Sequence, residues 1–411
     1  MNVTNINYFG MLKRSSIQCA VRYFAFLSAA PALLSQASDG TRQLLPAGEF
    51  YTSTREAALG GAAVAVADDG DAIFYNPAGI GREDGDKPDI LRGAAFPNFT
   101  LGMNKSTFEL YRAYVKGNEK SKAQAIEQTL AAANGKQVIT GQVSLFPYFT
   151  IGRFQIGFLS HSQGDGYVSK LNVAKESQFS TPDQPLSYDA QVKMQASSVA
   201  AIVTGMSIPL SPNASAGVSG RFGQRATLYR GLEVSDSVVR KSSESYGKFL
   251  NKTKGIGVDL GVLTTDPKLA GTPSFGVAVH DLGNTVYKGS SATQHDEMEK
   301  MNVVAGASFR PLNNSTSYTL VSVQGAHLND GRVALRDKFG VGAEVGIGGR
   351  DSRAPFSIRA GHNMRAPSVG VGADLLFLRA DATYYGKALD GADGVRVDPR
   401  FLIRMSVDLR G

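Results

Sequence analysis

Apolar and polar residues alternate with a period of two along many short segments of the chain. In residues 401–410 the odd positions are apolar and most even positions are charged or polar. Residues 339–347 alternate apolar side chains with glycine and glutamate, and residues 256–262 and 303–310 repeat the pattern. This alternation predicts β-strands that each have one apolar face.

We predict fourteen strands from these segments and from the turn residues between them. Their ranges are 90–103, 138–151, 153–162, 188–210, 214–229, 253–264, 273–282, 301–311, 316–326, 336–348, 355–363, 367–375, 378–387 and 399–410. The links between them alternate between short ones, such as Gly152-Arg153, and long ones, such as 163–187.

Two architectures explain the alternation, and the links separate them. A soluble sandwich buries the apolar face, whereas a membrane barrel turns it towards lipid and its polar face towards the lumen. Only the barrel has a reason to sort short turns to one side and long loops to the other. The pattern therefore predicts an all-β, antiparallel transmembrane barrel of about fourteen strands with helical extracellular loops.

The N-terminus is typical of a secretory signal peptide, which we place at residues 1–37. Lys13 and Arg14 precede an apolar stretch at 23–34, and Ser35-Gln36-Ala37 offers a cleavage site. An N-terminal membrane anchor is the alternative. No later run of eighteen apolar residues occurs, which argues against a helical membrane bundle. Cys19, the one cysteine, lies in the signal, so we expect no disulfide or thiolate site in the mature chain.

Charge and motifs exclude several classes of function. The net charge of +7 is scattered along the chain rather than clustered, so we expect no nucleic-acid partner. The five histidines form no HExxH motif, and no serine lies in a GxSxG motif. We therefore expect no catalytic residues, no metal and no cofactor.

Two long links, 106–133 and 234–251, carry apolar residues at helical spacing. An apolar groove at the outer mouth that captures a substrate is one interpretation. Loop helices that pack on each other or on the rim are the other. The candidate residues are Phe108, Tyr111, Ile126, Leu130, Tyr246, Phe249 and Leu250.

Residues 55–81 do not alternate like a strand. Small side chains are dense there, which permits close backbone approach inside a confined lumen. Asp68, Asp69 and Asp71 surround Gly70, a pattern that favours a turn over a calcium site. Pro77 predicts a change of chain direction at Asn76.

This segment resembles the start of the FadL-type long-chain fatty-acid transporter superfamily of outer-membrane proteins. The resemblance rests on Gly60-Gly61-Ala62, Ala67-Asp68-Asp69 and Phe74-Tyr75-Asn76-Pro77-Ala78-Gly79. It implies a lumenal plug at 38–86 and a fourteen-stranded barrel at 87–411, with passive uptake of hydrophobic compounds that leave through a gap in the wall. Related PorV-like barrels serve protein secretion instead. The motif residues of the plug are Gly60, Gly61, Asp68, Asp69, Phe74, Tyr75, Asn76, Pro77, Ala78 and Gly79.

The chain departs from such barrels at its end, Leu409-Arg410-Gly411, where an aromatic residue is common. The inward positions of the later strands carry alternating charges that form a ladder across the predicted lumen. A salt-bridged lining that anchors the plug is one explanation, and a polar substrate path is the other. The ladder comprises Asp259, Glu344, Arg359, Asp374, Arg379, Asp381, Arg404 and Asp408.

Two functions are consistent with these features. Passive uptake of hydrophobic compounds such as long-chain fatty acids predicts an apolar pocket beside residues 76–80, leading to a gap in the wall. A surface or secretion-accessory barrel that binds a protein partner predicts a lumen filled by plug and salt bridges. In both cases we expect a bacterial outer-membrane location, with membrane lipids and lipopolysaccharide as partners. Small hydrophobic molecules are further partners under the first hypothesis, and the sequence names no protein partner.

Overall fold

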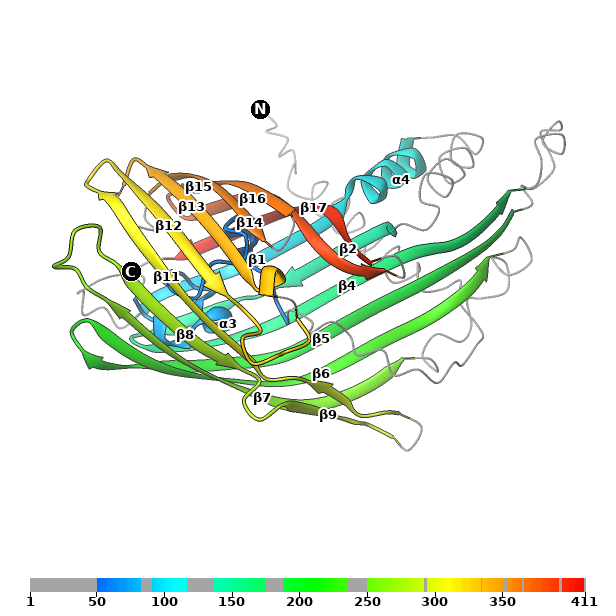
Figure 1. Ribbon diagram of the computed structural model, residues 1–411, viewed down its shortest axis with the longest axis horizontal. Helices are drawn as coiled ribbons and strands as arrows, with labels where there is room; N and C mark the ends of the chain where they lie inside the picture. Colours follow the sequence, from blue (N-terminus) through cyan, green and yellow to red (C-terminus); the bar gives the residue numbers. More distant parts are fainter. Residues whose placement is uncertain are drawn as a thin grey trace, which may run out of the picture.

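The structure is a computed structural model, shown as a ribbon in Figure 1. It describes residues 50–82, 91–116, 137–173, 188–234, 250–291, 294–333, 335–349, 354–363, 366–391 and 394–409. The predicted signal peptide lies outside these residues, as do positions 38–49 and 83–86 of the predicted plug.

Seventeen antiparallel strand segments form the wall of the molecule. They are β1 (Leu91–Asn104), β2 (Gln137–Leu145), β3 (Tyr148–Ile151), β4 (Phe154–Val173), β5 (Tyr188–Ser211), β6 (Ala214–Val234), β7 (Asn251–Thr265), β8 (Ser274–His280), β9 (Thr285–Gly289), β10 (Glu297–Glu299), β11 (Asn302–Asn313), β12 (Ser317–Gly325), β13 (Phe339–Ile347), β14 (Phe356–Asn363), β15 (Ala366–Leu375), β16 (Leu378–Gly391) and β17 (Gly394–Leu409).

The segments make a closed barrel of fourteen strands because three strands are each broken in two. β2 and β3 both pair with β1 and β4, and β8 and β9 both pair with β7. β10 and β11 continue the pairing on β9 and β8. β17 pairs with β1 and closes the ring. The prediction of a fourteen-stranded antiparallel barrel is confirmed.

The sequence prediction was wrong at the ends of several strands. β4 continues to Val173 and β6 to Val234, and β9 and β10 occupy the predicted link 283–300. These stretches are polar or very short, so they lack the sustained apolar alternation by which strands are recognised. Backbone pairing with a neighbouring strand forms them instead.

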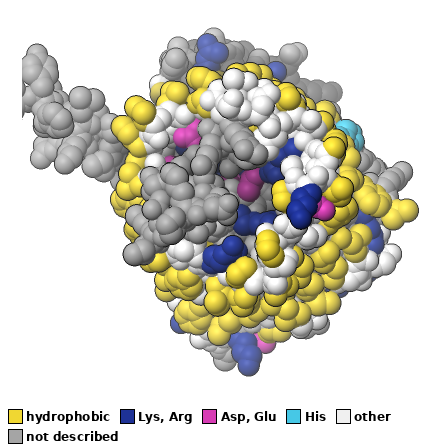
Figure 2. All heavy atoms as spheres, turned by 90° about the vertical axis from the view of Figure 1, so that its left-hand side faces the viewer, with side chains coloured by type: hydrophobic (Ala, Val, Ile, Leu, Met, Phe, Trp, Pro, Cys, Tyr) yellow, Lys and Arg dark blue, Asp and Glu magenta, His cyan; other side chains and the backbone are white. Residues whose placement is uncertain are grey.

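The outer surface of the barrel is apolar and its lumen is polar. In β13 the outward residues are exposed and apolar, whereas Gly340, Gly342, Glu344 and Gly346 face inwards and are buried. Figure 2 views the end with the short turns and shows hydrophobic side chains around the outside, with charged side chains in the middle. An apolar exterior on a closed sheet is the arrangement of a membrane-spanning barrel.

The described part of the plug is compact and lies inside the barrel. It contains α2 (Thr54–Ala58), α3 (Ala72–Tyr75) and the 3-10 turn η2 (Pro77–Gly79). Ser53 caps α2 by accepting a hydrogen bond from the Glu56 N–H. α2 contacts β14 to β17, while η2 contacts β5 to β7 on another side of the lumen. Plug and wall share a core in which the rings of Phe74, Phe146 and Tyr148 pack together.

Helix α4 (Lys105–Lys116) follows β1 directly at the long-loop end and contacts β1, β2 and β17 (Figure 1). It covers the first part of the helix predicted within 106–133. Residues 117–136 and 235–249, which hold the rest of the two predicted loop helices, lie outside the described residues. A second short 3-10 turn, η6 (Leu335–Asp337), precedes β13. No helix within the described ranges is long and apolar enough to cross a membrane.

Candidate functional site

Glycines on the inner wall allow the plug backbone to approach closely. A Cβ added to Gly217 would lie 2.2 Å from the carbonyl carbon of Pro77, and one added to Gly342 would lie 2.5 Å from the Leu59 oxygen. Gly261 and Gly276 meet the plug in the same way. Gly261 of β7 and Gly340 and Gly342 of β13 are therefore positions where any side chain would collide with the plug.

Asn76, in the motif that resembles the FadL-type plug, connects the plug to the wall. Its Nδ2 donates to the carbonyl oxygens of Val64, 2.8 Å away, and Val262, 3.1 Å away. Its Oδ1 accepts from the Ala78 N–H at 3.1 Å. The backbone at Asn76 is extended, with φ −160°, as expected before Pro77. One buried side chain thus joins two parts of the plug to strand β7.

Arg55 is the centre of an ion-pair network between plug and wall. Its guanidinium donates to both carboxylate oxygens of Glu344, at 2.8 and 2.9 Å, and reaches Asp68 at 2.5 Å. It also contacts Asp69 at 3.2 Å. Arg310 pairs with the second oxygen of Asp68 at 2.7 Å. The bidentate Arg55–Glu344 pair fixes the orientation of α2 against β13.

Most of the predicted charge ladder continues this network. Arg359 bridges Glu344 and Asp381, at 2.6 and 2.8 Å, and Arg379 pairs with Asp381 at 3.1 Å. Arg404 holds Asp71 of the plug at 2.5 Å. The remaining three members lie apart from this chain of contacts or at its end: Asp259 pairs with Arg221, Asp408 lies 4.0 Å from Arg379, and Asp374 is half-buried at the end of β15.

The three aspartates at 68, 69 and 71 all face arginines rather than a cation site. Burial alone would raise the pKa of Asp69, but the positive charges of Arg55 and Arg379 outweigh it and hold that pKa below its ordinary value. Tyr75 also donates its hydroxyl to Asp69. No group of three His, Cys, Asp or Glu side chains within the described ranges is placed to hold a metal ion.

Sequence reasoning missed several charged residues of the lumen, including Arg55, Arg221 and Arg400. Arg221 pairs with Asp259 and Asp281, and Arg400 pairs with Asp165 and Asp398. The parity of β6 and β17 would have found Arg221 and Arg400, because each lies on the inward face of its strand. No periodic pattern marks Arg55, which lies in a helix of five residues.

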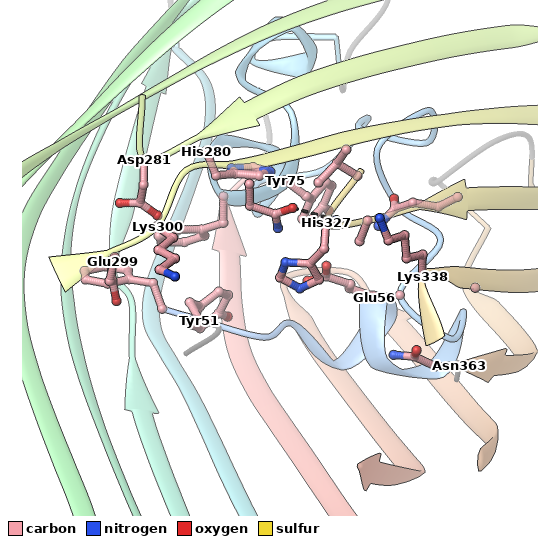
Figure 3. Close-up of a pocket in the computed structure, with 18 of the residues that line it drawn as sticks. Tyr51, Glu56, Tyr75, His280, Asp281, Glu299, Lys300, His327, Lys338 and Asn363 are labelled. Atoms are coloured by element: carbon pink, nitrogen blue, oxygen red, sulfur yellow. Dashed lines mark hydrogen bonds between the residues drawn. The ribbon is translucent and has the colours of Figure 1, made fainter. Parts of the chain in front are cut away.

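A pocket of about 150 Å³ lies between the plug and the wall (Figure 3). On the plug side its lining includes Phe50, Tyr51, Phe74 and Tyr75. On the wall side it is lined by polar and charged residues with a few apolar ones. The wall side includes Arg221, His280, Asp281, Glu299, Lys300, Asn302, His327, Asp337, Lys338 and Asn363.

Two lysines of this pocket differ from the arginines around the plug. Lys300 and Lys338 are half-buried and line the pocket on either side of His327 in Figure 3. Arg55, Arg221 and Arg404 each pair with acidic side chains. Within the part of the chain that the structure describes, neither lysine side chain forms an ion pair. Glu56, Asp281, Glu299 and Asp337 line the same pocket, so its lining carries both cations and carboxylates.

The pocket borders the place where two wall strands are broken. Asp281, Gly283 and Asn284, between β8 and β9, have left-handed backbone with φ of 53°, 76° and 70°. The Asn284 side chain accepts from the Met301 N–H at 2.9 Å, in the second break. Asn302 likewise accepts from the His327 N–H at 2.7 Å. Side chains thus accept hydrogen bonds from backbone N–H groups at the points where regular strand pairing stops.

The pocket differs from the one expected for fatty-acid uptake. The sequence predicted an apolar pocket beside residues 76–80, but Asn76, Pro77, Ala78, Gly79 and Ile80 are buried against the wall. The described pocket lies beyond Phe74 and Tyr75, and its lining mixes aromatic and charged residues. Wall glycines draw this part of the plug into direct contact, and an apolar pocket beside residues 76–80 stays a prediction.

The residues proposed for an outer groove are mostly outside the described structure. Ile126, Leu130, Tyr246 and Phe249 are not described. In α4, Phe108 is 53% exposed and Tyr111 is half-buried. Leu250 directly precedes β7 and lies in no helix. Both interpretations of the loop helices remain predictions.

Comparison with known proteins gives a likeness of shape only. No protein-family model and no curated protein matches the chain. The toluene transporter TbuX of Ralstonia pickettii is similar over 87% of this chain and 98% of its own, with 13% identity and a TM-score of 0.46. The toluene transporter TodX of P. putida is similar over 88% of this chain and 98% of its own, with 10% identity and a TM-score of 0.48. The monoaromatic hydrocarbon channel CymD is similar over 87% of this chain and 97% of its own, with 10% identity and a TM-score of 0.46.

The fold follows from the strand pairing described above.

Proposed function

We propose that the chain is an outer-membrane barrel for passive uptake of hydrophobic compounds that carry an acidic head group, such as long-chain fatty acids. The observation that supports this proposal is the pocket between plug and wall. Its plug side offers aromatic rings and Glu56, and its wall side offers Lys300 and Lys338, whose ammonium groups form no ion pair among the described residues. A half-buried ammonium group that forms no direct ion pair favours an anionic ligand, because a bound carboxylate adds to the electrostatic compensation that burial requires.

The size of the pocket limits what it can hold. Pockets that enclose a drug-sized ligand measure about 300–1,000 Å³. A pocket of about 150 Å³ takes a head group and the first part of an acyl chain, and the rest must lie outside it. The break between β8 and β9 borders the pocket and gives a place where the remaining chain can lie against the wall.

The experiment is an uptake assay with a matched lysine control. Cells without their own copy of the gene receive the natural chain, the double variant Lys300→Met/Lys338→Met, or Lys288→Met. Lys288 is exposed on β9 and does not line the pocket. We expect the natural chain and Lys288→Met to restore uptake of labelled long-chain fatty acid, and the double variant to lose most of it.

Equal uptake with and without the gene would reject the transport function. Uptake that depends on the gene but not on the two lysines would reject the acidic head group and leave uptake of neutral compounds.

A second candidate function is a barrel that conducts nothing and presents its loops to a protein partner. The ion pairs between plug and wall favour it, because a plug tied to both β13 and β17 leaves less free lumen. Gene-independent uptake in the assay above would support this second function.

A further inference from the structure

The turn between β15 and β16 is unlike other turns at the same end of the barrel. It consists of Leu376 and Phe377, flanked by Leu375 and Leu378, which pair with each other. Leu376 is 94% exposed and Phe377 is 53% exposed. Other short turns at this end are polar and consist of Gly152-Arg153, Pro212-Asn213 and Asn314-Ser315-Thr316.

The backbone conformation of this turn is also unfavourable for the residues that adopt it. Leu376 has a φ of 60°, in the left-handed region that glycine and asparagine adopt readily and that a leucine disfavours. Two-residue hairpin turns in water commonly use Asn-Gly or Asp-Gly for this reason. A leucine and a phenylalanine here offer neither good turn geometry nor favourable hydration.

The apolar turn continues the apolar outer surface of the wall. Leu375 follows Val369 and Val371 on the outward face of β15, and both valines are more than half exposed. Phe356 on β14 and Leu409 at the end of β17 are exposed at the same level. The Asp408 N–H donates to the Phe377 oxygen at 2.8 Å, which ties the turn to the end of the last strand.

We infer that the Leu376–Phe377 turn inserts into the acyl chains of the membrane leaflet on the short-turn side. We choose lipid as the partner of this turn, because the turn is continuous with the lipid-facing surface of the wall and contains no charged side chain. Immersion in hydrocarbon removes the two apolar side chains from water and offsets the unfavourable backbone at Leu376. The barrel then reaches deeper into the membrane at β15 to β17 than at its polar turns. This inference is independent of the proposed cargo.

The chain contains no tryptophan, so a single introduced indole reports on one position alone. We compare Phe377→Trp with Ser315→Trp, which places the indole in an exposed polar turn at the same end. Each full-length variant is reconstituted into phosphatidylcholine vesicles with or without bromine on the acyl chains, since bromine quenches indole fluorescence only at short range.

We expect Phe377→Trp to emit at a shorter wavelength, to lose most of its emission in brominated vesicles and to resist aqueous iodide. Ser315→Trp should be quenched by iodide and keep its emission in brominated vesicles. If both positions respond to iodide and neither to bromine, the turn lies in water as a surface for a soluble partner, and the inference is wrong. Leu376→Trp serves as a second variant if Phe377→Trp does not assemble.

Discussion

Two sides of the lumen hold the plug by different combinations of contacts. On the side of β11, β13 and β17, ion pairs add to the close glycine contacts of β13, and in them Arg55 meets Glu344, Arg310 meets Asp68 and Arg404 meets Asp71. On the side of β5 to β7 they are backbone contacts over glycine and single hydrogen bonds, such as those from Ser207 and Ser215 to plug carbonyl oxygens.

The two kinds of contact control two different things, the orientation of the plug and its distance from the wall. A bidentate ion pair is directional, so the charged side determines how α2 is turned against the wall. A glycine imposes no direction, but the absence of a Cβ determines how near the backbone can come. The charged side depends on mutual compensation of buried charges, whereas the side of β5 to β7 depends on volume and on neutral hydrogen bonds. The effects of substitutions on the free energy of unfolding should therefore differ between the two sides in size and in physical cause.

The largest effect is expected from Arg55→Ala, which breaks the charged side. Removing the guanidinium leaves the buried carboxylates of Glu344 and Asp69 with fewer partners, and breaking a buried ion pair costs about 3–5 kcal/mol. The measurement is the free energy of unfolding from urea titration of the protein in lipid vesicles. Arg332→Ala, which removes a pair with Asp330 in an exposed loop, is the control and should leave this free energy unchanged.

An equal response of the two arginine variants would show that the lumenal network does not stabilise the protein. Arg55→Lys sharpens the test, because lysine retains the charge without the bidentate geometry. Its free energy of unfolding should lie between those of the natural chain and Arg55→Ala.

The glycine side is tested by Gly217→Ala, with Gly220→Ala on the same strand as its control. A methyl group at Gly217 would lie 2.2 Å from the plug backbone, whereas one at Gly220 meets nothing within 4 Å. Overpacking of this kind costs about 1–3 kcal/mol, so urea unfolding should show a loss for the first variant only. A stable Gly217→Ala protein would mean that the plug retreats from β6 at little cost.

The smallest effect is expected from Ser215→Ala on the same side. The Ser215 hydroxyl donates to the Ala78 oxygen at 2.7 Å, and loss of one neutral hydrogen bond costs about 0.5–1.5 kcal/mol. Ser315→Ala, in an exposed turn, should change nothing in the same urea titration. A loss as large as that of Arg55→Ala would erase the distinction between the two sides.

Much of the fold was predictable because strand alternation is a local property. In β13 the exposed apolar residues and the buried Gly340, Gly342 and Glu344 follow the parity of the sequence. That parity is imposed by the pleat of the strand, in which successive side chains point to opposite faces. The strand count, the inward charges of the ladder and the extended backbone at Asn76 followed from such local rules.

The site was less predictable because its contacts join residues far apart in the chain. Arg55 meets Glu344 across 289 positions, and nothing near either residue in the sequence indicates the other. The pocket required Tyr51 of the plug and Lys300 and Lys338 of the wall to meet around one space.

The sequence by itself determined a closed barrel with an apolar exterior, because the alternation within a strand and the length of a link are local properties of the sequence. Only the tertiary structure decided where the plug presses against glycine and where it is held by charge. It also placed a pocket of about 150 Å³ beside the broken strands at Asp281 and Asn284. The physical reason is that packing and charge compensation depend on which side chains converge in the lumen, and local periodicity carries no information about that convergence.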